Sequence, residues 1–142
     1  MITFRPAQEK DFPAIAGILT ELELAHPSIR PERFLLAIED NEIAGVANLE
    51  DCGGSLYLSA VGVRLSSQGR GIARAMLSRI AETAEKEIYV YTRIPKFFEL
   101  FGFAPANAPG EIPPRTIYDC EACGGLHECL CMSRKPDASN FS

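Results

Sequence analysis

The chain has 142 residues, of which 46% are apolar and 23% are charged, values close to the average for globular proteins. This length corresponds to about one domain. Fourteen basic and nineteen acidic side chains give a net charge of −5. Because affinity for nucleic acid comes largely from Lys and Arg neutralising phosphates, this charge argues against DNA or RNA as the main partner. It leaves room for one small anion in a local basic pocket.

The sequence shows no membrane or export signal. No run approaches the roughly 18 apolar residues of a membrane span, and Met1 to Arg5 show no basic stretch followed by an apolar core. We therefore expect no membrane partner, no signal peptide and a cytoplasmic location. We expect one domain over residues 1–135 and a flexible tail over 136–142. A homodimer is left open.

The predicted elements of the first half are a strand, a helix and three antiparallel strands. Ile2 to Arg5 alternates apolar and polar residues, as a short strand does. Asp11 is expected to cap a helix that has Pro13 in its first turn. Two apolar runs, 34–38 and 43–49, flank a polar turn, which is typical of a hairpin. A third strand is expected over 56–65.

The second half alternates helices and short strands. A helix is expected to open at Gly69-Arg70-Gly71, with one apolar face formed by Ile72, Ala73, Met76, Ile80 and Ala84. A strand at 88–91 follows, then a helix over 95–100 that ends at Gly102. A proline-rich loop and a last strand at 127–132 complete the chain. The order predicts a mixed α/β fold with a mostly antiparallel central sheet flanked by helices.

The most informative segment runs from Val61 to Arg74, where a strand passes through a glycine turn directly into a helix. Glycine permits backbone conformations closed to other residues and lets a ligand approach the chain closely. The unpaired N–H groups and the positive dipole end of a helix start attract phosphate. The alternative is that Gly69 and Gly71 only make the turn. Their spacing matches neither the dinucleotide fingerprint nor the P-loop pattern.

These residues resemble the GNAT (GCN5-related N-acetyltransferase) superfamily, whose motif is a strand followed by Gln/Arg-x-x-Gly-x-Gly/Ala at a helix start. Gln68, Gly71 and Ala73 fill those positions, and Val63 matches the apolar residue that ends the family's central strand. Segments 2–7 and 97–103 also look like the family's start and its final helix-turn. The resemblance implies a single-domain GNAT fold and an enzyme that transfers the acetyl group of acetyl-CoA to an amine.

The resemblance also implies where acetyl-CoA binds. The pyrophosphate is expected on the amides of the turn with the Gln68 side chain alongside, while Arg70 and Arg74 either add charge or face solvent. The pantetheine arm is expected to pair with the central strand, where the amide of Val61 or Gly62 would stabilise the oxyanion. In chain order, the expected cofactor-binding residues are Val61, Gly62, Val63, Gln68, Gly69, Arg70, Gly71, Ile72, Ala73 and Arg74.

A narrower resemblance concerns the acceptor. Segment 90–103 is similar to the N-acetylglutamate synthase branch, with matches at Thr92, Arg93, Phe98, Gly102 and Phe103 and departures at 91 and 94–97. This resemblance favours an amino acid such as glutamate as acceptor and Arg93 as its binding residue. The alternatives are a peptide or protein N-terminus and, in another class, a non-catalytic acetyl-CoA-binding sensor.

Neither a catalytic acid nor a base is assigned. Many family members protonate the leaving thiolate with a Tyr on the last helix, and the corresponding residue here is Phe98. A thiol with a pKa of about 8.5 leaves as thiolate without that acid. Candidate bases are Glu50, Asp51 and Tyr57, with ordinary structural roles as the alternative. Guanidinium groups for the carboxylates of glutamate are available at Arg30, Arg33, Arg93 and Arg115.

The five cysteines are Cys52, Cys120, Cys123, Cys129 and Cys131. An odd number without an export signal disfavours a disulfide framework. Cys-x2-Cys-x5-Cys-x-Cys, with His127 inside it, has zinc-ligand types but lacks a second Cys-x-x-Cys pair. No metal ligand is assigned, and zinc binding, redox chemistry and plain burial stay open for the cluster.

Overall fold

A computed structural model of the chain describes residues 2–22, 33–92, 94–112 and 130–136. The chain divides into two compact units, the first formed by Met1–Glu50 with Leu58–Arg79 and the second by Asp51–Tyr57 with Ile80–Ser142. None of the helices within the described ranges is long and apolar enough to cross a membrane.

The first unit is built on antiparallel strands: β1 (Ile2–Pro6), β2 (Phe34–Glu39), β3 (Glu42–Asp51) and most of β4 (Leu56–Val63). β1 pairs with β2, and β2 pairs with β3 around a bulge between Ala37 and Ile38. Asp40 and Asn41 join β2 to β3 with φ angles of 52° and 63°. Two left-handed residues match the twist of a hairpin, so the predicted hairpin is confirmed.

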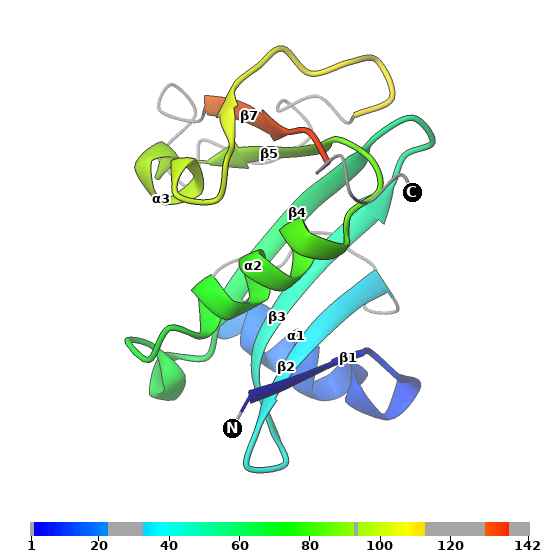
Figure 1. The fold of residues 1–142 in the computed structure, drawn as a ribbon. Coiled ribbons are helices and arrows are strands. Elements are labelled where there is room, and N and C mark those ends of the chain that lie inside the picture. Colours follow the sequence, from blue (N-terminus) through cyan, green and yellow to red (C-terminus); the bar gives the residue numbers. More distant parts are fainter. Residues whose placement is uncertain (1, 23–32, 93, 113–129, 137–142) are drawn as a thin grey trace. The chain divides into compact units, whose positions relative to one another are not determined.

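Helices cover both faces of these strands (Figure 1). α1 (Phe12–Glu21) buries Ile15, Ile18 and Leu19 against a cluster completed by Phe34, Leu36, Val46 and Ala60. α2 (Ile72–Thr83) lies on the opposite face, where a Cβ at Gly45 would meet Met76 Sδ at 2.8 Å. Ile72, Met76, Ile80 and Ala84 are buried as predicted, whereas Ala73 is half-buried.

Asp11 precedes α1 as expected, but its side chain makes no capping bond to the helix. Its carboxylate accepts two hydrogen bonds from the Arg5 guanidinium, at 2.7 and 3.0 Å, and one from the Gln8 backbone N–H at 2.8 Å. The Arg5 bonds, followed by the Gln8 bond, lower the pKa of Asp11 to about 2. The residue therefore ties β1 to the start of α1 rather than capping the helix.

The second unit holds the start of β4, the end of α2, β5 (Ile88–Thr92), α3 (Pro95–Glu99), β6 (Ala104–Pro105) and β7 (Leu130–Arg134). β5 runs parallel to β4 at Leu56 and Tyr57 and antiparallel to β7. The strand order is β1-β2-β3-β4-β5-β7-β6. This order confirms the predicted mixed α/β fold with a mostly antiparallel sheet.

Two features differ from the prediction, and one predicted boundary is not tested. β4 ends at Val63 because Leu65–Ser67 turn into a short 3-10 helix, η3. β6 was not predicted, since two residues of which one is proline give no strand pattern. The described part of the last strand begins at Leu130, and the expected start at 127–129 lies outside the described residues.

α3 ends at the predicted glycine. The φ of Gly102 is 86°, its N–H donates to the carbonyl of Glu99 at 3.1 Å, and the Phe103 N–H donates to Phe98 at 3.3 Å. These two bonds are those of a Schellman helix end, which requires a left-handed residue. They place the rings of Phe98 and Phe103 edge to face, 5.4 Å apart.

Candidate acetyl-CoA site

The turn between β4 and α2 is the segment expected to hold the pyrophosphate. Gly69 and Gly71 have φ angles of 83° and 80°, which residues with a Cβ rarely adopt. A Cβ at either glycine would meet no atom of the structure within 4 Å. The backbone conformation, and not crowding, therefore demands glycine here, and the space beside both glycines is open.

The start of α2 supplies hydrogen-bond donors to the same turn. The Ala75 N–H donates to the Gly71 carbonyl at 3.0 Å. The amides of Ile72, Ala73 and Arg74 come earlier and, as in the first turn of any α-helix, have no carbonyl within the helix to bond. These donors and the positive helix dipole favour an anion, so the residues present fit the pyrophosphate of acetyl-CoA.

Side-chain and backbone bonds hold the turn on the strand. The Gln68 side chain donates from Nε2 to the carbonyl of Val63 at 3.0 Å. The Arg64 N–H donates to Ala44 of β3 at 2.8 Å, and the buried Ser67 donates its N–H to Arg64 at 2.8 Å. In this structure the side chain of Gln68, which was expected beside the pyrophosphate, thus holds the turn to the end of β4.

β4 directs alternate backbone groups to opposite edges. The Arg64 N–H bonds to β3, and the Gly62 carbonyl lies 3.3 Å from a Cβ placed on Gly45 of β3. The backbone N–H and C=O of Gly62 therefore point toward β3, whereas those of Val61 and Val63 point toward the other edge of β4. Of the two amides expected to stabilise the oxyanion, that of Val61 is the one that faces away from β3.

Two arginines of the turn, Arg64 at its start and Arg70 between its two glycines, are paired with carboxylates of the β2–β3 hairpin. Arg70 contacts Glu39 at 2.6 Å, and Arg64 contacts Glu42 at 3.2 Å. Arg74 is exposed on α2. Glu39 and Glu42 were missed by the sequence analysis, because nothing in their spacing links a hairpin turn to a loop so much later in the chain.

The candidate bases are engaged elsewhere. Glu50 forms an ion pair with Arg33. Asp51 accepts bonds from Lys86 and from the Gly53 N–H, which lower its pKa and make it a weaker base. Tyr57 is 3% exposed and packs against Tyr89 and Ile112. No base is assigned from these residues.

Phe98 is also buried, with its ring edge to face against Phe97 and Phe103. A phenylalanine side chain has no hydroxyl group to donate a proton, so no catalytic acid is assigned at this position. Arg30, Arg93 and Arg115, the other residues considered for the acceptor, lie outside the described residues.

One of the clustered cysteines can be placed. Cys131 lies on β7, half-buried against the cluster of Tyr57, Tyr89 and Ile112, which Cys52 also contacts. Cys120, Cys123, His127 and Cys129 fall outside the described ranges. Within those ranges, no group of at least three His, Cys, Asp or Glu side chains is placed to hold a metal ion.

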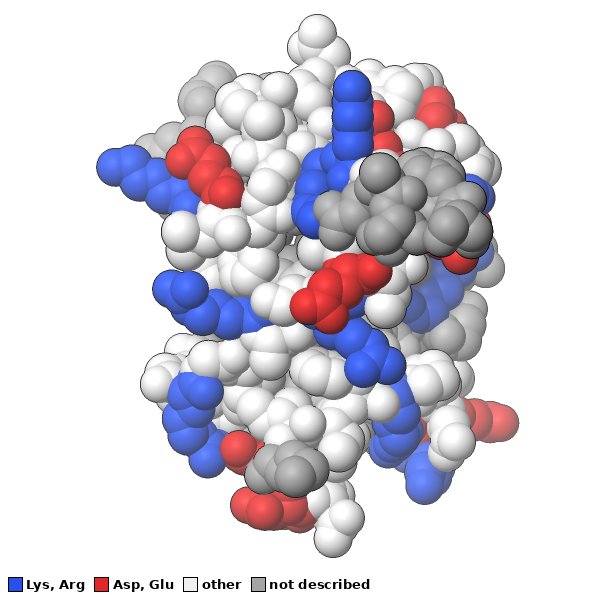
Figure 2. All heavy atoms as spheres, viewed as in Figure 1, with Lys and Arg blue, Asp and Glu red and all other residues white. Residues whose placement is uncertain are grey.

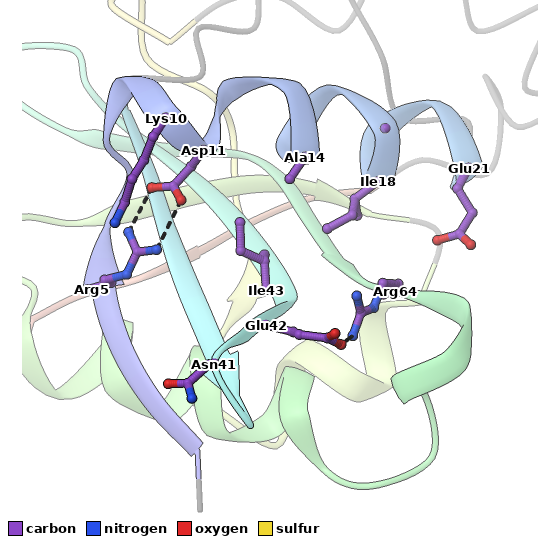
Figure 3. Close-up of a pocket in the computed structure, with 11 residues that line it drawn as sticks. Arg5, Lys10, Asp11, Ala14, Ile18, Glu21, Asn41, Glu42, Ile43 and Arg64 are labelled. Atoms are coloured by element: carbon purple, nitrogen blue, oxygen red, sulfur yellow. Dashed lines mark hydrogen bonds and ion pairs between the residues drawn. The ribbon is translucent and has the colours of Figure 1, made fainter.

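A pocket of about 630 Å³ lies beside the turn in the first unit, between α1 and the β2–β3 hairpin (Figure 3). Arg64 and Glu42 point toward each other across one side of it, and Arg5 pairs with Asp11 on the other. On the face shown in Figure 2, basic and acidic side chains are likewise interspersed. The positive charges near the turn are therefore largely balanced by neighbouring carboxylates.

A mixed sheet whose central strand enters a helix through a two-glycine turn is the arrangement expected of a GNAT acetyltransferase. Residues 3–103 match the model of the Acetyltransferase (GNAT) family, and the chain belongs to this family. Its members are acetyl-CoA-dependent N-acetyltransferases, with acetyl-CoA as the acetyl donor.

Solved structures share the fold at low sequence identity. N-acetylglutamate synthase from Neisseria gonorrhoeae, complexed with coenzyme A and N-acetyl-glutamate, matches 96% of the chain with a TM-score of 0.75 at 20% identity. The chain spans 35% of that protein's length. Rv2747 from Mycobacterium tuberculosis, in complex with CoA and NLQ, matches 94% of the chain over 98% of its own length. The TM-score of this match is 0.71 at 17% identity.

Arabidopsis thaliana Naa50, in complex with the bisubstrate analogue CoA-Ac-MVNAL, matches 94% of the chain and 98% of its own length. Its TM-score is 0.63 at 17% identity. These similarities establish the fold, and the acceptors differ among the proteins.

Proposed function

We propose that the chain transfers the acetyl group of acetyl-CoA to the primary amine of a small metabolite, with an amino acid such as glutamate as the first candidate. The two-glycine turn at the start of α2 is the observation that carries the donor half of this proposal. The acceptor half is supported by the likeness of segment 90–103 to the synthase branch. The fold match to a synthase complexed with N-acetyl-glutamate agrees with it.

In this proposal the amides of Gly71 to Arg74 hold the pyrophosphate, and the outward peptide groups of Val61 and Val63 guide the pantetheine arm. The neutral amine of the acceptor attacks the thioester carbonyl, and the Val61 N–H donates to the oxyanion of the tetrahedral intermediate. The C–S bond then breaks, coenzyme A leaves as a thiolate, and the surplus amine proton passes to water. Positioning the two substrates accounts for much of the rate.

The acceptor is tested by turnover of acetyl-CoA with a pool of the twenty amino acids, read by mass spectrometry of the acetylated products. Thiol reagents are avoided because five cysteines would react. Acetylglutamate as the sole product supports the synthase-like function. A different single product keeps the enzyme and excludes glutamate.

Arg93→Ala is the companion variant, since Arg93 is the residue proposed to bind the acceptor carboxylate. Its KM for the acceptor should rise far more than its KM for acetyl-CoA. Lys96→Ala, which removes a positive charge from the exposed face of α3, is the matched control and should change neither. Equal effects of Arg93→Ala on both KM values would exclude the role.

The second candidate is acetylation of a peptide or protein N-terminus, which the fold match to Naa50 with its peptide-bearing analogue favours. A peptide library with varied first residues, run beside the amino-acid pool, separates the two. Binding of acetyl-CoA with no product from either pool would indicate a sensor.

A further inference from the structure

The turn proposed to carry the phosphate-binding amides is tied to the tip of the β2–β3 hairpin at two points, its start and its glycine segment. Glu39 and Glu42 flank the tip residues Asp40 and Asn41. Glu39 Oε1 lies 2.6 Å from Arg70 Nη2, and Glu42 Oε2 lies 3.2 Å from Arg64 Nη2. Two ion pairs thus join a hairpin to a turn that follows it by a whole strand.

The Glu39–Arg70 pair is the more closely held of the two. The side chain of Glu39 is 18% exposed, against 69% for Glu42, and its contact is the shorter. A less exposed carboxylate loses less of its attraction to solvent screening. Arg70 itself is 53% exposed, so the pair sits at the surface and contributes modestly.

The place of Arg70 in the turn gives this pair its significance. Arg70 stands between Gly69 and Gly71, both with left-handed φ angles. A glycine has many accessible backbone conformations, and it has no side chain whose contacts could hold it in one of them. The ion pair of the Arg70 side chain with Glu39 is thus the contact that fixes the middle of the turn.

We propose that Glu39 is a positioning residue for acetyl-CoA: by holding Arg70, it orders the peptide groups of Gly69 to Gly71 so that the neighbouring amides face the phosphates. This inference rests on the phosphate placement in the proposed function. The competing view makes Arg70 a direct phosphate ligand and Glu39 its competitor. The two views predict opposite signs for the loss of Glu39.

The test is calorimetric titration of the full chain with coenzyme A, which needs no knowledge of the acceptor. The variants are Glu39→Gln, Arg70→Gln, the double variant with both changes, and the charge swap Glu39→Arg with Arg70→Glu. Asp40→Asn is the matched control, because it removes one negative charge from the neighbouring exposed position, and Asn tolerates its left-handed backbone. Thermal unfolding of each variant checks folding.

If Glu39 positions the turn, Glu39→Gln and Arg70→Gln each raise the Kd for coenzyme A about three- to fivefold, the size of a surface ion pair. The double variant loses no more than either single one, since both remove the same contact. The charge swap recovers most of the affinity, and Asp40→Asn binds as the wild type does. Acetyl-pantetheine, which lacks the phosphates, binds all the variants with the same Kd in the same titration.

Tighter binding by Glu39→Gln, or affinity unchanged by it, overturns the proposal. A charge swap that binds no better than Arg70→Gln also overturns it, because a direct phosphate ligand cannot be replaced by a carboxylate. Wild-type protein that fails to bind coenzyme A overturns the donor site of the proposed function as well. The two failures are therefore distinguishable.

Discussion

The Gln68 side chain closes the turn between β4 and α2 by donating from Nε2 to the carbonyl of Val63, at 3.0 Å. Five positions separate the two residues, and the short 3-10 helix Leu65–Ser67 fills the interval. Val63 is the last residue of β4, on the strand edge that faces away from β3. One hydrogen bond thus links the end of the strand to the start of the glycine segment.

Gln68→Ala should weaken coenzyme A binding about three- to tenfold, since the turn loses a hydrogen bond whose net contribution is about 0.5–1.5 kcal/mol. Calorimetric titration measures the affinity. Ser66→Ala, at an exposed position of the same 3-10 turn, is the control and should bind normally. Equal affinity of Gln68→Ala and wild type for coenzyme A would show that the Gln68–Val63 hydrogen bond is dispensable for binding.

Gly71→Glu should abolish detectable coenzyme A binding in the same titration. The substitution forces a residue with a Cβ into a φ of 80° and places a carboxylate where the phosphates are proposed to bind. Gly17→Glu makes the same change on the exposed face of α1, where a Cβ meets nothing within 4 Å, and this variant should bind coenzyme A normally. Unchanged affinity of Gly71→Glu would remove the phosphates from this turn.

Gly45→Val should destabilise the protein by about 1–3 kcal/mol, the usual cost of overpacking. A Cβ at Gly45 would lie 2.8 Å from Met76 Sδ, 3.2 Å from Ile72 Cγ2 and 3.3 Å from the Gly62 carbonyl. Met76 and Ile72 are buried and have little room to move. Urea unfolding measures the loss, and Gly17→Ala, which meets no neighbour, should cause none.

Asp11→Asn should lower Tm at neutral pH, and its difference from the wild type should shrink as the pH falls from about 4 to about 2. The pKa of Asp11 is lowered from 3.8 to about 2 by Arg5 and the Gln8 N–H. A carboxylate whose pKa is lower in the folded state stabilises the protein above its unfolded pKa, and this contribution is lost on acidification through the folded value. Arg5→Gln should show the same trend. A Tm difference that stays constant over this range would mean that the ion pair does not contribute.

Features that depend on local conformation were predictable from the sequence. Gly71 and Gly102 mark places where the chain needs a left-handed residue, and both have positive φ in the structure. The spacing of Ile72, Met76 and Ile80 identified the buried face of α2 for the same reason, because a helix repeats every 3.6 residues.

Features that depend on tertiary contacts were not predictable. Asp11 has the residue type of a helix cap, yet a guanidinium from β1 binds its carboxylate instead. Glu39 read as an ordinary turn residue, and only the folded hairpin brings it to Arg70. For the acceptor, the sequence offered Arg93 through a family resemblance alone, and its role stays a prediction.

The outer strands of the sheet have a consequence for self-association. β1 ends in Pro6 and β6 in Pro105, and these strands stand at the two ends of the strand order. Proline has no N–H to donate to an incoming strand, and β6 has only two residues to offer. Each outer strand therefore ends at a residue that cannot donate to an added strand, which shortens the ladder that such a strand could form with it.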